Sequence, residues 1–354
     1  MKIFPCLPRS FRRPAPVVAI GVFDGVHFAH RRILESAAKK AGASGGTSVA
    51  LTFYPHPQSQ KSLYSLEHRI KLIAECGIDV CAVLDFSSAF SALTAEEFLR
   101  GIIYKRLNAR HVYVGDNFRF GRGAAGGVGL LRAFGRKLGF GVRVFPRMRC
   151  GGRPVSSTLI RKFILAGKLT EAERMLGRPV SVYGTVIKGD RFGRRIGFPT
   201  ANIDPHHEIL PPAGVYSVNV LPDIPGRSRP LNGLCYIGRR PTLGKGSERR
   251  IEVYIFDCAR DLYGRNLSIN FLRMIRRDRK FPSVAALKKQ IAKDVEKARG
   301  LFLKNEAPRA VKPGDFWARG LNRKTGLGCR VNGPGKSKKN REAGSRNTRS
   351  PIRS

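Results

Sequence analysis

A change in the spacing of apolar residues near residue 180 constrains the fold of this chain more than any other feature. From about residue 15 to residue 178, short β-branched runs alternate with stretches in which apolar residues recur every three or four positions. This alternation predicts a doubly wound parallel sheet with crossover helices. Beyond residue 180, short β-rich runs separated by Gly and Pro turns predict a small antiparallel barrel.

The expected elements follow from these periodicities. In the first part, strands are predicted at Val17–Gly21, Ser48–Phe53, Val80–Asp85, His111–Val114 and Gly141–Phe145. Helices are predicted at His30–Ala41, Leu66–Cys76, Ala95–Leu107 and Leu130–Leu138. In the second part, strands are predicted at Val180–Ile187, Gly214–Val220, Asn232–Ile237, Ile251–Phe256 and Leu267–Phe271. A helix is expected from Val284 to about Arg299, with Ser283 as its N-cap.

Size and composition agree with two domains and a tail. The chain has 354 residues, of which 42% are hydrophobic, enough for two cores. We expect domains at 1–178 and 179–305, and a basic tail at 306–354 that is too poor in apolar residues to fold. No run approaches the ~18 apolar residues of a membrane span. The seven cysteines are scattered without a C-x-x-C pair, which favours reduced thiols in the cytoplasm over a zinc site.

The formal net charge of +41 is extreme. Such a chain is expected to bind polyanions nonspecifically and in a salt-dependent way. Because the basic residues are spread along the whole sequence, a compositional bias is favoured over a dedicated surface, and no specific nucleic-acid partner is expected. An RNA-binding protein built on an enzyme scaffold is the alternative that the charge leaves open.

One segment combines glycines, basic residues and paired polar side chains. The stretch Gly184–Asn202 reads GTVIKGDRFGRRIGFPTAN. Glycines allow close approach of the backbone to a phosphate, and here they include Gly189, Gly193 and Gly197. Thr200 and Asn202 are two residues apart, so on an extended segment both oxygens share one face, as a nucleotide-bound metal ion requires. The structural alternative is a Gly-rich hairpin turn with a polar strand end.

A second segment places two histidines between the first predicted strand and the first helix. Residues 21–30 read GVFDGVHFAH, so His27 and His30 flank the helix start. Helix N-termini bind anions, and two imidazoles there suit the phosphates of a nucleotide. Surface histidines near a helix start are the alternative interpretation.

Three further motifs are candidates for ligand contacts. Pro55, His56 and Pro57 follow the second strand, and Asn117 and Phe118 follow a later one, where the carboxyl ends of parallel strands gather ligands. A Pro-rich loop is the alternative for the first of these. The third motif consists of hydroxyls before a helix with a nearby cation, which either cap the helix or bind phosphate: Ser156, Ser157, Thr158 and Arg161.

Taken together, these motifs resemble the prokaryotic bifunctional riboflavin kinase/FAD synthetase family. GTVIKGDRFGRRIGFPTAN is similar to the kinase signature, and IEVYIFD at 251–257 followed by DLYG at 261–264 is similar to the segment with the catalytic glutamate. GVFDGVHFAH resembles the H-x-G-H motif of nucleotidyltransferases. The motifs run in the family order from about Val17 to about Arg299. The resemblance implies a Rossmann-like nucleotidyltransferase domain and a small β-barrel riboflavin kinase domain with a terminal helix.

For the barrel, the resemblance implies ATP-dependent phosphorylation of riboflavin to FMN. Glu252 would be the base that takes the proton of the ribityl hydroxyl. Thr200 and Asn202 would contact Mg²⁺ and the ATP phosphates, which Gly189, Gly193 and Gly197 would cover.

For the first domain, the resemblance implies transfer of AMP from ATP to FMN, giving FAD and pyrophosphate. His27 and His30 would contact the phosphates of ATP. The other residues implied at ATP are Gly21, Phe23, Asp24, Ser156, Ser157, Thr158 and Arg161. The residues implied at the flavin are Pro55, His56, Pro57, Asn117 and Phe118.

The sequence departs from this family at Ala29, which stands where H-x-G-H has glycine. If residue 29 has a positive φ, alanine costs about 1 kcal/mol. If it is helical, the change is harmless or favourable. A riboflavin kinase with a degenerate adenylyltransferase domain is therefore the alternative function.

Overall fold

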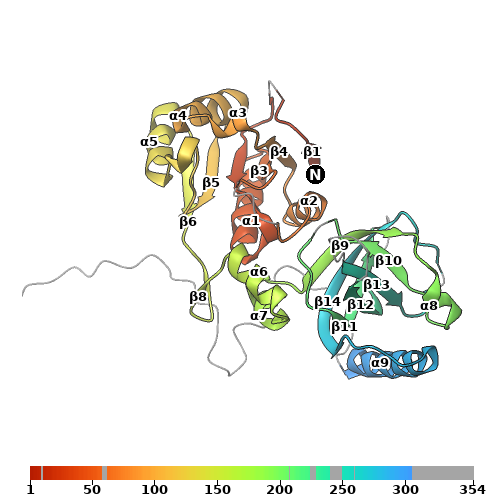
Figure 1. Ribbon diagram of the computed structural model, residues 1–354. Helices are drawn as coiled ribbons and strands as arrows, with labels where there is room; N and C mark the ends of the chain where they lie inside the picture. The colour runs from red at the N-terminus through yellow and green to blue at the C-terminus, as the bar shows by residue number, and fades with distance from the viewer. Residues whose placement is uncertain are drawn as a thin grey trace, which may run out of the picture.

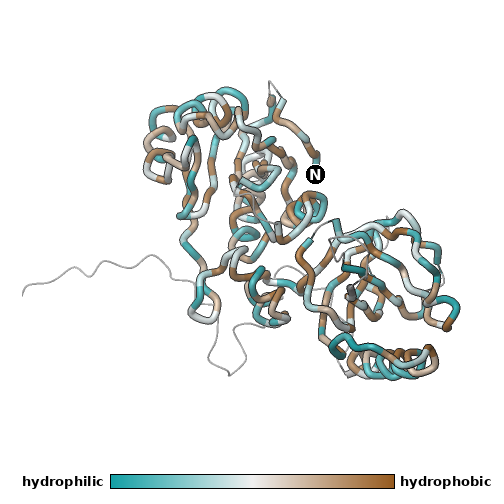
Figure 2. The backbone as a smooth tube through the Cα atoms, in the orientation of Figure 1, coloured by the Kyte–Doolittle hydropathy of each residue, from teal (hydrophilic) through white to brown (hydrophobic). Residues whose placement is uncertain are grey.

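The computed structural model describes residues 1–8, 11–57, 62–206, 208–223, 229–239, 249–258 and 260–304. The predicted tail at 306–354 and Cys329 lie outside the described residues. The described chain forms a helix-covered sheet followed by a barrel with one long helix beside it (Figure 1). Hydrophobic residues follow the strands of both parts, whereas the long helix carries both kinds of residue (Figure 2).

The first part is a six-stranded parallel sheet, as predicted. Its strand order is β1-β4-β3-β2-β5-β6, and every pairing is parallel. The strands are β1 (Lys2–Phe4), β2 (Val17–Ile20), β3 (Ser48–Tyr54), β4 (Val80–Asp85), β5 (His111–Gly115) and β6 (Gly141–Phe145). Strand β1 was not predicted, because a three-residue edge strand is too short to show a periodicity.

Helices cover both faces of this sheet. The helices before the barrel are α1 (Phe28–Ala43), α2 (Leu66–Ala74), α3 (Ser88–Ser91), α4 (Ala95–Glu97), α5 (Val128–Leu138), α6 (Ser157–Leu165) and α7 (Leu169–Leu176). Of these, α6 and α7 pack on each other, and α7 also contacts β9 and β14 of the barrel. The predicted helix Ala95–Leu107 begins as α4 and continues with π geometry as η2 (Phe98–Arg106). Along β2, Val17 and Ala19 belong to one core cluster, and Val18 and Ile20 belong to the other. Alternate residues therefore serve opposite faces, as a doubly wound sheet requires.

The second part is a closed antiparallel barrel, which confirms the predicted fold class. Its strands run in the order β10-β13-β12-β11-β14-β9. They are β9 (Val180–Ile187), β10 (Ala201–Asp204), β11 (Gly214–Pro222), β12 (Leu231–Arg239), β13 (Arg249–Ile255) and β14 (Asn266–Arg277). Strand β10 was not among the predicted strands, because four residues that include Asn202 and Asp204 do not form an apolar run.

The helix α9 (Val284–Lys304) packs on the outside of the barrel. Ser283 accepts a hydrogen bond from the Ala286 amide at 3.1 Å, as its predicted N-cap role requires. Buried Asp294 accepts from Arg276 of β14 at 2.8 Å. Arg276 therefore fixes α9 to the barrel.

Candidate active sites

Three neighbouring strands end at the same edge of the sheet, and the predicted motifs follow them. β2 lies between β3 and β5 and leads into Gly21, while β3 leads into Pro55 and β5 into Asp116. After β2 the chain continues to β3 on one side of it, whereas β5 pairs with β2 on the other side. Ligands bind at such a reversal of strand order, outside the carboxyl ends of the strands.

The two histidines form one packed unit at the start of α1. His27 is the N-cap, and its Nδ1 accepts from the His30 amide at 3.4 Å. The rings stack with centroids 3.6 Å apart and 17° between their planes. Burial lowers the pKa of His27 to about 3 and that of His30 well below its usual range. Both imidazoles are therefore neutral at pH 7, and each offers one N–H donor.

The second feature of this unit is one ring nitrogen of His30. Its Nδ1 is buried and has no hydrogen-bond partner in the part of the chain that the structure describes. Other buried polar atoms share this property, among them Arg69 Nε and Arg178 Nε, so on this ground alone the atom is one candidate contact for a bound molecule or water.

Ala29 lies in the first turn of α1 with helical backbone geometry. The possibility of a strained, positive φ at this position is therefore wrong. In a helix, alanine is favoured over glycine by about 1 kcal/mol, so the substitution supports the helix that carries His30.

The buried histidines make stability depend on pH. The usual pKa of histidine is 6.5, and that of folded His27 is about 3, so folding stability is fully present above pH 6.5 and falls as pH drops toward 3. Between pH 7 and pH 5, we expect the free energy of unfolding of the unmodified chain to fall by about 2 kcal/mol more than that of His27→Asn, which keeps an N-cap acceptor. Urea unfolding at both pH values measures this difference. Equal losses would contradict the neutral, buried His27.

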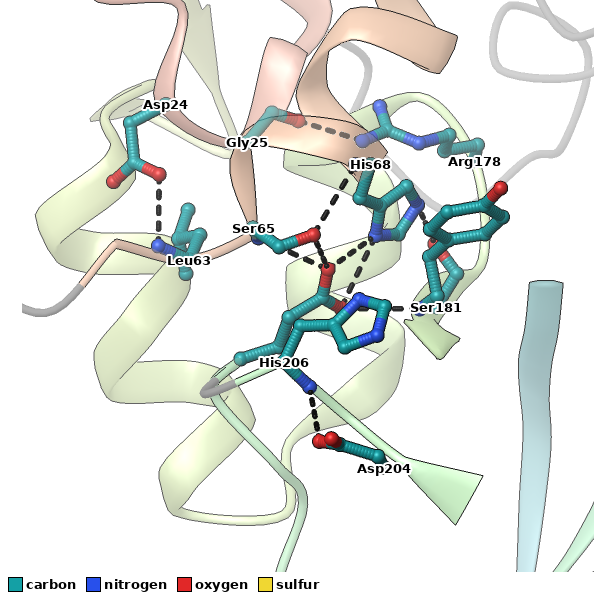
Figure 3. Close-up of polar contacts among 11 residues, drawn as sticks. Asp24, Gly25, Leu63, Ser65, His68, Arg178, Ser181, Asp204 and His206 are labelled. Atoms are coloured by element: carbon teal, nitrogen blue, oxygen red, sulfur yellow. Dashed lines mark hydrogen bonds and ion pairs between the residues drawn. The ribbon is translucent and has the colours of Figure 1, made fainter. Parts of the chain in front are cut away.

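Asp24 connects three segments of the first domain: its own loop, the segment at Leu63 and helix α6. Its Oδ1 accepts from the Leu63 amide at 2.7 Å, and its Oδ2 lies 3.2 Å from the Arg161 guanidinium. Its backbone carbonyl accepts from the Ser157 hydroxyl at 2.7 Å. Burial raises the pKa of Asp24, whereas its hydrogen bond to Leu63 and the charge on nearby His56 oppose that rise. Asp24 thus contacts two other predicted site residues, Ser157 and Arg161. Its bond to Leu63 is drawn in Figure 3.

Of the three hydroxyls predicted before a helix, only Ser156 precedes α6, whereas Ser157 and Thr158 lie in its first turn. Ser156 caps the helix by accepting from the Leu159 amide at 3.3 Å, as the capping alternative proposed. Ser157 holds the Asp24 carbonyl, and Thr158 is exposed. In the loop after β2, Gly21 is half-buried, whereas Phe23 is fully buried and packs edge-on against His30 at 5.3 Å.

The residues expected at the flavin lie beyond β3 and β5. Pro55 is exposed, and His56 and Pro57 are half-buried. Asn117 is exposed, and half-buried Phe118 stacks on Phe120 with ring centroids 5.3 Å apart. Phe120 itself belongs to the core of the sheet domain.

Two arginines that no motif indicated support these loops. Arg69, which is 1% exposed, donates to the Val22 carbonyl at 2.8 Å and to the Phe53 carbonyl at 3.2 Å. It therefore ties the loop after β2 to the end of β3. Arg178 donates to the carbonyls of Gly25 and Val26 at 2.6 and 2.8 Å. Each contact spans a long stretch of sequence, and no local pattern signals it.

In the barrel, strand register assembles the second candidate site. Asn202 of β10 pairs directly with Glu252 of β13. The Thr200 hydroxyl donates to Glu252 at 3.1 Å. Arg250, which the sequence analysis did not single out, reaches Glu252 at 2.7 Å and Asn202 at 3.1 Å through its Nε.

The glycine segment lies directly over these polar groups. A Cβ added at Gly189 would overlap the Asn202 amide, and one at Gly193 would overlap the Phe198 carbonyl and press on Thr200. Gly197 has φ +90°, a conformation that other residues rarely adopt. The segment also contains a short helix, α8 (Phe192–Arg195), so it is more than the predicted loop.

Comparisons with known proteins match both parts of the chain. The family model of FAD synthetase matches residues 12–159, and that of riboflavin kinase matches residues 176–302. The bifunctional riboflavin kinase/FMN adenylyltransferase of Escherichia coli (strain K12) is 37% identical over 294 residues, covering 81% of this chain and 92% of the relative. The chain belongs to this bifunctional family.

A second curated relative and a solved structure extend the comparison. The Pseudomonas fluorescens bifunctional riboflavin kinase/FMN adenylyltransferase is 36% identical, covering 80% of this chain and 92% of its own. A solved structure from Streptococcus pneumoniae, described as a macrolide-efflux protein, has a TM-score of 0.71 and 30% identity, covering 84% of this chain and 99% of that one.

None of the helices in the described part of the chain has the length and apolar character of a membrane-spanning segment.

Proposed function

We propose that this chain makes both flavin cofactors in two steps. The barrel transfers the γ-phosphoryl group of ATP to riboflavin, giving FMN and ADP. The sheet domain then transfers AMP from a second ATP to FMN, giving FAD and pyrophosphate. Both family models match, and the relatives of comparable length are named for both activities. A time course with riboflavin and Mg-ATP tests the proposal, with FMN expected first and FAD following.

In the kinase step, Glu252 is the proposed general base. Its carboxylate accepts a hydrogen bond from Thr200, and its strand position is paired with that of Asn202. Both relations place the carboxylate beside the side chains assigned to Mg-ATP. There it takes the proton of the ribityl hydroxyl as that oxygen attacks the γ-phosphorus and ADP leaves. The side chains of Glu252, Thr200 and Asn202 offer only oxygen ligands. The Arg250 guanidinium already contacts Glu252 and Asn202.

This donor set fits Mg²⁺, which prefers oxygen ligands and binds together with nucleotide phosphates. Thr200 and Asn202 would hold it, and it would neutralise charge on the ATP phosphates. Two side chains cannot complete the octahedral coordination of Mg²⁺, so the phosphates are expected to supply further ligands.

In the adenylyl step, the protein positions the substrates and supplies hydrogen-bond donors. We assign the phosphates of ATP to the neutral His27 and His30 and to Arg161. Asp24 holds Arg161 and the loop after β2 in place. The exposed Thr158 and half-buried Gly21 complete the ATP side, with Phe23, Ser156 and Ser157 beneath it. FMN is assigned to Pro55, His56, Pro57, Asn117 and Phe118.

The kinase site is expected to be sensitive to a single methyl group. Gly189→Ala places a Cβ against the Asn202 amide and displaces it. We expect riboflavin phosphorylation to fall about tenfold or more, since misplaced positioning groups have effects of this size. FAD formation from supplied FMN is expected to be unchanged. Gly129→Ala is the matched control, because nothing lies within 4 Å of its added Cβ in α5. Equal kinase rates for the two variants would contradict the proposed cover over ATP.

Nonspecific polyanion binding is a second, minor proposal. Arg12, Arg13 and Lys105 line an open concavity of about 640 Å³ near the amino-terminal ends of β2 and β5, away from both candidate sites. Binding that collapses as salt rises indicates simple electrostatics, whereas selective binding at physiological salt supports the RNA-binding alternative. We also propose a cytoplasmic location. The free thiols of the cysteines within the described residues agree with it.

A further inference from the structure

We propose that Glu208 of the barrel is a positioning residue for adenylyl transfer in the other domain. This inference rests on the proposed function. Glu208 lies after β10 in the barrel, and it reaches the segment that leads into α2 of the sheet domain. Figure 3 shows Ser65, His68 and Ser181 converging beside Asp24 and Leu63.

Glu208 is the centre of a buried network between the domains. Its side chain has no exposed surface, and that of His68 is 2% exposed. One carboxylate oxygen accepts from the Ser65 amide at 3.0 Å, the Ser65 hydroxyl at 2.9 Å and His68 Nδ1 at 2.9 Å. The other accepts from the Tyr183 amide of β9 at 3.2 Å. Burial of a carboxylate is tolerated only when its lone pairs are satisfied in this way.

His68 carries the network back to the barrel. Its Nε2 lies 3.3 Å from the Ser181 hydroxyl of β9, so the imidazole bridges Glu208 and the barrel wall. The fixed segment from Leu63 to His68 is therefore held from two sides by barrel residues.

Two residues before Ser65, the same segment holds the ATP loop. The Leu63 amide donates to Asp24 at 2.7 Å, and the Leu63 carbonyl accepts from the Ile209 amide at 3.3 Å. Leu63 thus joins the residue after Glu208 to the carboxylate that orients Arg161. A displaced Leu63 would release Asp24 and misalign Arg161, and small displacements of positioning groups have large effects on rate.

Glu208→Gln is the direct test in the full chain, with FAD formation from supplied FMN as the readout. The variant keeps the size of the side chain but replaces one acceptor oxygen with an NH₂ donor. Both carboxylate oxygens of Glu208 accept from N–H groups, so the introduced NH₂ donor faces another donor in either orientation of the amide. We expect kcat/KM for ATP to fall about tenfold or more, and riboflavin phosphorylation to stay within about twofold.

A matched control removes a different contact between the domains. Lys71 Nζ lies 3.1 Å from Asp223 in an exposed pair that does not touch Leu63. Lys71→Ala is expected to leave FAD formation within about twofold of the unmodified chain. A merely structural role for Glu208 would lower both activities together with the melting temperature.

Hydrogen exchange supplies a second readout. We expect the amides of Leu63 and Ser65 to exchange faster in Glu208→Gln, while those of β2 and β3 keep their protection. If Glu208→Gln fails to fold, Ser65→Ala removes one donor to Glu208, together with the N-cap that accepts from the His68 amide at 3.2 Å, and leaves the carboxylate buried. A fall of about two- to fivefold is expected in FAD formation.

The outcomes separate this inference from the proposed function. An unmodified chain that makes no FAD contradicts the proposed function itself. An active chain whose Glu208→Gln variant forms FAD at the normal rate, with Leu63 and Ser65 fully protected, overturns the positioning role alone.

Discussion

Replacing Glu252 by glutamine is expected to lower FMN formation roughly 100-fold or more, because positioned general bases contribute about 10²–10⁴ to rate. Glutamine keeps an oxygen that accepts from Thr200 but cannot take a proton. FAD formation from supplied FMN is expected to continue at the normal rate, since Glu252 lies in the barrel. Chromatography of flavins after incubation with riboflavin and ATP measures the first reaction.

Glu296→Gln is the control for this substitution. Glu296 is exposed on α9, outside the candidate site. Its variant is expected to phosphorylate riboflavin at the normal rate. If Glu252→Gln keeps substantial kinase activity, or loses both activities while folded, the assignment of the base is wrong.

His30→Ala is expected to have the opposite selectivity. Loss of one preorganised donor at developing charge costs about 10²–10³ in rate, so FAD formation should fall by this factor while FMN formation persists. The unpartnered Nδ1 within the described part of the chain and the depressed pKa both favour a neutral imidazole at the phosphates.

The control for His30 is another half-buried histidine of the same domain. His111 lies at the start of β5, at the far end of the strand from the site. His111→Ala is expected to leave FAD formation unchanged. Full FAD formation by His30→Ala would remove His30 from the mechanism.

Local pattern was sufficient for the parts of the fold with strong periodicity. The strands Val80–Asp85, Gly141–Phe145 and Val180–Ile187 have the bounds that the sequence predicted, because each is bordered by turn or helix signals. β10 escaped notice, although it carries Asn202, because its pairing with β13 and β9 stabilises it rather than its own composition.

The supporting groups of the sites depend on contacts distant in sequence. Arg69, Arg178 and Glu208 act through backbone carbonyls or amides in other segments, and each looks in isolation like an ordinary charged residue. Arg250 is likewise one of two adjacent arginines, and only the barrel register brings it to Glu252. Motifs identify groups that meet a ligand, whereas tertiary packing selects the groups that hold them.

The most direct test of the central claim follows two phosphorus labels into the flavin products. Purified chain is incubated with riboflavin, Mg²⁺ and ATP labelled at either the γ- or the α-phosphorus. We predict that the γ-label enters FMN and then FAD, whereas the α-label enters FAD alone. FMN that carries the γ-label and persists, with the α-label never reaching a flavin, would contradict adenylyl transfer by the sheet domain.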